Sequence, residues 1–236
     1  MPSTFDDNTS AAARLSGARL SAVLYDTLKS RLLEGVYAAG DRIVVEQVRQ
    51  EFQVSKQPVM DALRRLAAER LVAIIPQSGI EVVQYSHREI EDFYLLFSDF
   101  EATIAAVAAS RRTDRQLDTL RRTLTDVDHL LESADPAARA RGYRIHNREF
   151  HAAIHAMSHS RIMEETSQRM WDLSDFLVTT VGGIQQLSNS IHDRNRDHDI
   201  IRTAIRSKNP DVARAAMESH IVGIVAAFTA TLDTTG

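Results

Sequence analysis

The order of hydrophobic patterns in residues 45–83 constrains the fold of this chain more than any other feature. A short amphipathic segment, VVEQVRQEF, is followed by the break QVS and by a longer amphipathic segment, KQPVMDALRRLAAERL. Two apolar β-branched runs then flank the turn-forming sequence PQSG, which predicts a β-hairpin. A short helix, a turn, a second helix and a β-wing place the second helix where its exposed face can enter a DNA major groove. We therefore predict a winged helix-turn-helix that binds DNA.

The composition is that of an ordinary globular protein. The chain has 236 residues, 44% of them hydrophobic and 25% charged, which is enough for two domains with separate cores. It has no cysteine, which excludes disulfides and thiolate catalysis and is compatible with the cytoplasmic location that we expect. We find no apolar run near the ~18–20 residues that span a bilayer, so we predict no membrane association. The net charge of −4 means that any phosphate-binding surface must be a local patch.

The chain divides into three predicted parts. Residues 1–18 are polar and rich in small residues, which predicts a disordered arm. Residues 19–85 form the winged-helix DNA-binding domain, with three helices and a β-hairpin wing. Residues 86–236 show helical periodicity throughout, so the fold class is mainly α and this domain is an antiparallel bundle for effector binding, metal binding and dimerisation. We predict six helices in the bundle, leaving a seventh open, at about residues 87–111, 114–132, 136–157, 161–180, 191–207 and 210–231.

The second helix of the DNA-binding motif, at about residues 56–68, has two different faces. Val59, Leu63 and Leu66 fall on one side, where they should pack against the preceding helices. An ordinary amphipathic helix with a solvated basic face is the alternative, which the order of helix, turn, helix and wing disfavours. The opposite side and the wing tip carry the candidate DNA-binding residues, which are Ser55, Lys56, Gln57, Met60, Asp61, Arg64, Arg65 and Gly79.

The polar side chains on this outer side have expected roles. Ser55 should cap the helix and leave its amide groups facing a phosphate. Lys56 and either Arg64 or Arg65 should neutralise phosphates. Gln57 is the best candidate for reading a base, because its amide can pair with N6 and N7 of adenine.

The same segments resemble the winged-helix domain of GntR-type transcriptional regulators. The resemblance covers LYDTLKSRLLEGVYAAGDRI and SKQPVMDALRRLAAERLVAIIPQSGIEVV, in the family's order of long helix, recognition helix and glycine-tipped wing. It implies a transcription regulator, and we expect a homodimer that binds an inverted-repeat operator in double-stranded DNA. Met60 stands where the family commonly has an arginine that reads guanine, and a thioether cannot donate a bidentate pair, so we expect a different operator. Arg70 stands at a family glycine.

Three histidines lie on three different predicted helices, each with apolar residues at helical spacing. They are His151, His198 and His220, and Asn147 lies one turn before the first of them. Inward-facing imidazoles are costly when unpaired, and three of them on packed helices can satisfy one another by sharing a cation. Neutral imidazole suits Zn²⁺, Ni²⁺ or Cu²⁺, and an amide oxygen adds a ligand that Mn²⁺ accepts. The alternative is three unrelated buried histidines.

Residues 87–232 resemble the FCD ligand-binding domain of the FadR branch of the GntR family. NREFHAAI is similar to the family motif D-x-x-x-H, DHDIIRTAI to E-H-x-x-I-x-x-A-I, and NPDVARAAMESHI to G-D-x-x-x-A-x-x-x-M-x-x-H. The resemblance implies one divalent metal, Zn²⁺, Ni²⁺ or Mn²⁺, at Asn147, His151, His198 and His220. Asn147 replaces the family's aspartate, which should weaken the affinity for metal. Six helices rather than seven indicate the shorter VanR-like subgroup.

The resemblance also implies a small-molecule effector, often a carboxylate that the metal helps to hold. The family motif R-x-x-L-E appears here as residues 97–101 without its arginine, which makes a different or less acidic ligand plausible. Arg194, one turn before His198, and Arg144, about one turn before Asn147, are the candidates for binding an anionic effector. Both could instead be surface charges, which we favour for Arg144.

These features lead to one preferred function and two alternatives. We predict that the protein is not an enzyme but a ligand-responsive repressor, released from DNA by a metabolite that binds next to the metal. A metal-dependent hydrolase could use the same three histidines with an open metal position. We disfavour it because no carboxylate lies at a motif position where a general base is expected. A helical protein with purely structural histidines is the third possibility.

Overall fold

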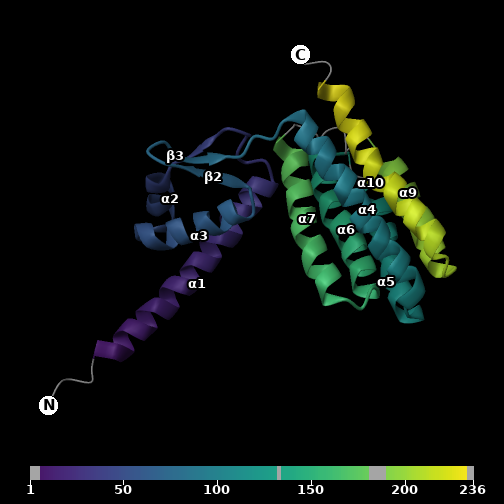
Figure 1. The fold of residues 1–236 in the computed structure, drawn as a ribbon, viewed down its shortest axis with the longest axis horizontal. Helices are drawn as coiled ribbons and strands as arrows, with labels where there is room; N and C mark the ends of the chain where they lie inside the picture. Colours follow the sequence, from purple (N-terminus) through teal and green to yellow (C-terminus); the bar gives the residue numbers. More distant parts are fainter. Residues whose placement is uncertain (1–5, 132–133, 181–189, 233–236) are drawn as a thin grey trace. The chain divides into compact units, whose positions relative to one another are not determined.

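The computed structural model describes residues 6–131, 134–180 and 190–232, and its helices and strands are labelled in Figure 1. The chain forms two units that divide between Gln84 and Tyr85, one residue before the domain boundary expected from the sequence. The described residues are mainly helical, with a small antiparallel sheet in the first unit.

The first unit combines helices with a three-stranded sheet. Its elements, in chain order, are α1 (Asp6–Leu33), β1 (Arg42–Ile43), α2 (Val45–Phe52), α3 (Lys56–Ala68), β2 (Val72–Ile75) and β3 (Gly79–Val82). Strand β3 lies between β1 and β2 and is antiparallel to both. Helices α1 and α3 contact each other, and Leu24, Leu28, Leu63 and Leu66 on them have no exposed surface. Burial of this apolar surface fixes α3 in place and turns its other face outward.

Two features of the first unit differ from the prediction. Helix α1 begins at Asp6, so residues 6–18 of the expected disordered arm are helical, while residues 1–5 lie outside the described residues. Three consecutive alanines at residues 11–13 favour this extension, because alanine has the highest helix propensity. Strand β1 is missing from the prediction, because two residues are too few to show an alternating pattern. It pairs with β3 and so turns the expected hairpin into a three-stranded sheet.

The wing contains the predicted hairpin turn. Ile75 lies opposite Gly79 in the pairing of β2 with β3, and the N–H of Ser78 donates to the carbonyl of Ile75 at 3.1 Å. Gly79 has a φ of +106°, which residues with a side chain rarely adopt. Arg70, before β2, has a φ of +64° at the position where the related family has glycine, a strain of roughly 1 kcal/mol for an arginine.

The second unit contains the six predicted helices, each beginning and ending within one residue of the predicted bounds. They are α4 (His87–Arg111), α5 (Asp114–Leu131), α6 (Pro136–Met157), α7 (Arg161–Thr180), α9 (Ile191–Arg206) and α10 (Pro210–Leu232). The capping box predicted before α4 is present, because the Ser86 hydroxyl accepts from the N–H of Glu89 and the Glu89 carboxylate accepts from the N–H of Ser86. A seventh helix would fall in residues 181–189, outside the described residues.

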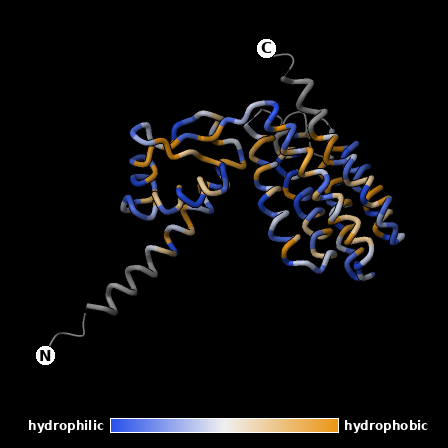
Figure 2. The backbone as a smooth tube through the Cα atoms, in the orientation of Figure 1, coloured by the Kyte–Doolittle hydropathy of each residue, from blue (hydrophilic) through white to orange (hydrophobic). Residues whose placement is uncertain are grey.

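Helix α4 is a core helix of the second unit and contacts α6, α7, α9 and α10 (Figure 1). Apolar and polar residues mix along the helices of this unit, as expected for amphipathic helices in a bundle (Figure 2). Contrary to the expectation from the sequence, α4 is long and apolar enough to cross a membrane by length and composition alone. Half of its most apolar window is buried within the unit, and its buried side chains include Tyr94, Phe97 and Ile104. This packing accounts for its apolar composition.

Candidate DNA-binding face and buried histidine cluster

The outer face of α3 presents most of the residues that the sequence singles out for DNA binding. Met60 and Asp61 are half-buried, and Val59 on the inner side has no exposed surface. The amphipathic pattern therefore turns basic and amide groups toward solvent, where phosphates and base edges can reach them. The exposed candidates are Ser55, Lys56, Gln57, Arg64, Arg65 and, at the wing tip, Gly79.

Asp61 connects two of these side chains. Its Oδ1 atom accepts a hydrogen bond from Nε2 of Gln57 at 2.8 Å and another from Nη1 of Arg64 at 2.9 Å. The three residues are spaced three or four apart on α3, where successive turns bring side chains together. The Gln57 amide keeps its carbonyl oxygen and a second N–H, which are the groups that an adenine edge requires. Asp61 thus orients the side chain expected to read a base.

Two other candidates, the N-cap residue of α3 and an arginine near its end, behave differently from their expected roles. Ser55 occupies the N-cap position with an extended backbone, but its side chain makes no capping hydrogen bond. The first-turn amide groups therefore lack the predicted serine cap. The guanidinium carbon of Arg65 lies 3.7 Å above the ring of Tyr25 on α1, a cation–π contact that helps to join α3 to α1. Arg64 is therefore the better candidate of the two arginines for a phosphate contact.

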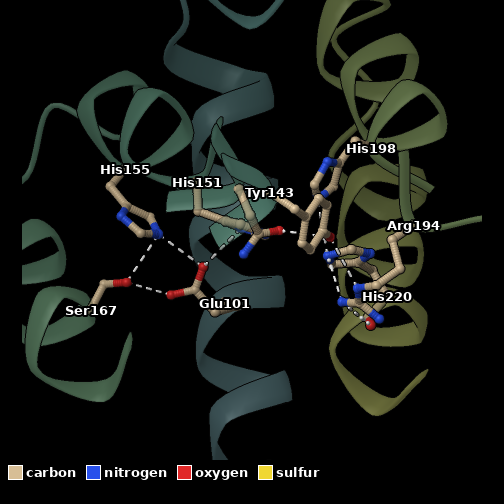
Figure 3. Close-up of polar contacts among 9 residues, drawn as sticks. Glu101, Tyr143, His151, His155, Ser167, Arg194, His198 and His220 are labelled. Atoms are coloured by element: carbon tan, nitrogen blue, oxygen red, sulfur yellow. Dashed lines mark hydrogen bonds and ion pairs between the residues drawn. The ribbon is translucent and has the colours of Figure 1, made fainter. Parts of the chain in front are cut away.

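Three of the predicted metal ligands come together inside the second unit. His151 lies on α6, His198 on α9 and His220 on α10, and each is at most 1% exposed. Ring nitrogens from the three histidines lie within 4.8 Å of one another, and Nε2 of His198 is 3.2 Å from Nε2 of His220. Figure 3 shows these side chains and the polar residues around them. We call His151, His198 and His220 the histidine cluster.

Burial keeps the histidine cluster neutral. Loss of water contact lowers the pKa of each of the three imidazoles well below its usual value, and the positive charge of Arg194 lowers it further. Both ring nitrogens of His151 and Nδ1 of His198 have no hydrogen-bond partner among the described residues. Buried polar atoms without partners are costly, and neutral imidazole is the form that binds metals. The cluster therefore has the chemistry of a cation site.

Arg194 is the candidate effector residue that the structure places beside this cluster. It is 5% exposed, its Nε donates to the Tyr143 hydroxyl at 3.1 Å, and its Nη2 lies 3.1 Å from Nε2 of His220. The Tyr143 hydroxyl donates in turn to Oδ1 of Asn147 at 3.1 Å. Asn147, predicted as a ligand, is thus connected to His220 through Tyr143 and Arg194. The sequence prediction misses Tyr143, although its position four residues before Asn147 puts both on one face of α6.

Arg144, the other candidate for binding an effector, interacts with charged residues away from the histidine cluster. Arg144 is half-buried, and its charge acts on the carboxylate of Asp175 on α7. Burial raises the pKa of Asp175 to about 6, and the charges of Arg148 and Arg144 oppose this rise. Arg148 also forms an ion pair with Asp172. Arg144 therefore belongs with the charged residues that join α6 to α7.

A buried carboxylate that the sequence reasoning overlooks lies beside the cluster. Glu101 on α4 has no exposed surface, and its Oε2 is 2.8 Å from Nε2 of His155 and 3.8 Å from Nδ1 of His151. Ser167 donates to the other oxygen of Glu101 and lies 2.9 Å from Nε2 of His155 (Figure 3). This carboxylate was not considered when the sequence was found to offer no candidate for a general base. The sequence feature that could have identified Glu101 is its place as the last residue of the family motif at residues 97–101.

A winged-helix unit followed by an all-helical unit is the architecture of a class of DNA-binding transcriptional regulators. Residues 20–82 match the gntR family of bacterial regulatory proteins, and residues 92–223 match the FCD domain. The chain belongs to the GntR family of regulators that carry an FCD domain.

Curated relatives are regulators of the same kind. The chain is 24% identical over 208 residues to the HTH-type transcriptional repressor GlaR of Escherichia coli K12, a match that spans 84% of this chain and 90% of that protein. It is 26% identical over 211 residues to the Uxu operon regulator of Haemophilus influenzae, and this match spans 84% of this chain and 77% of that protein. The chain is therefore a transcriptional regulator and not an enzyme, which sets the hydrolase alternative aside.

Solved structures share the fold. The E. coli McbR/YncC structure superposes with a TM-score of 0.74 at 19% identity, over 90% of this chain and 98% of that one. A GntR transcriptional regulator from Rhodococcus sp. RHA1 gives a TM-score of 0.71 at 17% identity, also over 90% of this chain and 98% of that one.

The neutral histidines predict a loss of stability in acid for protein treated with a chelator. Their folded pKa values lie below the value of about 6.5 for an unfolded histidine, so the unfolded chain binds more protons below that pH. The stability is complete above about pH 6.5 and is lost as the pH falls, by up to about 1.4 kcal/mol per pH unit for each histidine. Denaturant unfolding between pH 7.5 and pH 5.5 measures this slope. His198→Phe should reduce the slope, and equal slopes for the two proteins would contradict neutral burial.

Proposed function

We propose that this regulator is a homodimeric repressor in the cytoplasm, released from an inverted-repeat operator by a small metabolite that binds next to a divalent metal. The observation that supports the sensing part is the histidine cluster, three neutral buried imidazoles, of which His151 and His198 have ring nitrogens without a hydrogen-bond partner among the described residues. The relative from E. coli K12 is named a repressor, which supports the direction of regulation. The exposed face of α3 supports the contact with DNA.

The residues present fit a divalent metal. His151, His198 and His220 offer three neutral nitrogen donors, which suit Zn²⁺ or Ni²⁺. Asn147 offers an amide oxygen, which has a second lone pair beside the one that accepts from Tyr143 and which Mn²⁺ also tolerates. A bound metal would satisfy the orphaned nitrogens and supply positive charge for an anionic ligand. The donor set is uncharged, so its affinity for metal should be lower than that of a site with an aspartate at position 147.

Arg194 is the residue that we propose to bind the effector. Its guanidinium is buried at the edge of the histidine cluster, and a guanidinium presents a planar set of donors that matches a carboxylate once its present partners are exchanged for the effector. An effector held by Arg194 of α9 and by a metal on α6, α9 and α10 contacts three helices at once. Binding can therefore shift these helices against α4, and a coupling of about 1–3 kcal/mol is enough to change operator affinity by about 5- to 150-fold.

The experiment that tests the proposed function is an operator-binding titration with candidate effectors. Bound sequences are first selected from random DNA, and because of Met60 we expect them to lack the guanine that the family's arginine usually reads. Small carboxylates that bind the zinc-loaded protein by calorimetry are then added to the protein–operator complex. We expect at least one of them to raise the operator dissociation constant severalfold, whereas its uncharged amide analogue should not. An unchanged constant for every carboxylate that binds would refute ligand-responsive repression.

Arg64 should contribute one phosphate contact. Arg64→Ala should weaken binding to all operator sequences and reduce the slope of log K against log salt by about one. Arg196→Ala is the matched control, because Arg196 is 63% exposed and pairs with Asp193 three residues earlier, just as Arg64 is 59% exposed and pairs with Asp61. Fluorescence anisotropy at several salt concentrations measures both variants. Equal slopes in the two would show that Arg64 does not contact a phosphate.

A further inference from the structure

Arg194 donates a hydrogen bond to the atom through which His220 faces the histidine cluster. Arg194 lies one turn before His198 on α9, so both side chains point toward His220 on α10 (Figure 3). Its Nη2 is 3.1 Å from Nε2 of His220. A guanidinium only donates hydrogen bonds, so Nε2 of His220 must be the acceptor and must carry a lone pair. The proton of the neutral His220 ring is then on Nδ1, which lies 3.4 Å from Oδ2 of Asp197.

A second N–H group points to the same lone pair. Nε2 of His198 is 3.2 Å from Nε2 of His220, and this contact is attractive only when His198 carries its proton on Nε2. Nδ1 of His198 is then the unprotonated nitrogen, and it has no hydrogen-bond partner among the described residues. In the absence of metal, two N–H groups therefore converge on one nitrogen of His220.

Metal binding and this arrangement exclude each other at His220. An imidazole nitrogen has a single lone pair, which either accepts the N–H of Arg194 or binds a metal ion. The Asp197 contact keeps the proton on Nδ1, so His220 has no other nitrogen to offer. We propose that Arg194 occupies the metal-binding lone pair of His220 in the metal-free protein, and that metal binding displaces it. This inference rests on the proposed metal site.

Arg194 then has two opposite effects on the site. In the metal-free protein it lowers the affinity for metal, because its hydrogen bond to His220 must be broken and its charge repels a divalent cation. After metal binding, the freed guanidinium would be a buried cation that needs an anion, and the Tyr143 hydroxyl, 3.1 Å from its Nε in the metal-free protein, would keep it at the site. The metal therefore prepares the binding site for an anionic effector, and the two should bind cooperatively.

The test is calorimetric titration of the chelator-treated full chain with Zn²⁺. The Arg194→Met variant lacks the competing N–H and the charge. It should bind Zn²⁺ at least roughly tenfold more tightly than the unmodified protein. Tyr143→Phe removes the hydroxyl that holds Nε of Arg194, and should give a smaller increase. Arg196→Met makes the same change of charge at an exposed position of α9 and should leave the affinity unchanged.

A second measurement does not depend on how well the methionine variant folds. The ¹⁵N NMR signal of the Arg194 Nε–H in the unmodified protein should shift when Zn²⁺ saturates the site, and the signal of Arg196 should not. Equal zinc affinities for the unmodified protein and the Arg194→Met variant, or an unshifted Arg194 signal at saturation, would overturn the displacement. No zinc binding by any of the four proteins would instead refute the metal site itself, and the displacement with it.

Discussion

Three imidazole rings buried together, two of them with ring nitrogens that have no hydrogen-bond partner among the described residues, impose the main constraint on the second unit of this protein. Each unsatisfied buried polar atom lowers the stability of the folded state by about 1–3 kcal/mol, and packing of the surrounding helices must offset that loss. The same rings lie next to a buried guanidinium, that of Arg194, which adds the cost of a desolvated charge. An interior built only for stability would fill these positions with apolar side chains. The arrangement therefore supports the proposed binding of a metal and an effector at this site.

The contacts of this site connect helices that are distant in sequence. His151 and Tyr143 belong to α6, Arg194 and His198 to α9, and His220 to α10. A change in what the cluster binds must alter hydrogen bonds between all three helices at once. The proposed effector would act on the second unit through these hydrogen bonds. The first unit contributes α3, whose inner side is fixed by its packing on α1 and whose outer side presents Gln57 and Arg64.

Much of this structure could be predicted from local patterns in the sequence. Helical periodicity, capping residues such as Ser86 and the turn chemistry near Gly79 act within a few residues, so they locate helices and the wing accurately. The three histidines could be assigned to inward faces for the same reason, and the resemblance to the FCD domain grouped them. Strand β1 was beyond this reasoning, because only its partner β3 defines it.

The contacts that the sequence did not reveal all depend on tertiary packing. The cation–π contact of Arg65 with Tyr25 joins residues of two helices, and the bond of Arg194 to Tyr143 joins residues 51 positions apart. Glu101 shows the same limit, since only packing brings α4 against α6 and α7 and places this carboxylate between His155 and Ser167. Spacing along a helix shows which of its residues lie on the same face, but not which side chains of another helix they will contact.

The most direct test of this account is the number of metal ions that each chain binds. Purified protein is dialysed against Zn²⁺, Ni²⁺ or Mn²⁺ and then against metal-free buffer, and bound metal is counted by mass spectrometry. We expect about one ion per chain for at least one of these metals, its loss in His220→Ala, and its retention in the exposed-site variant His192→Ala. Absence of bound metal in the unmodified protein, or equal binding by the His220→Ala variant, would contradict this account.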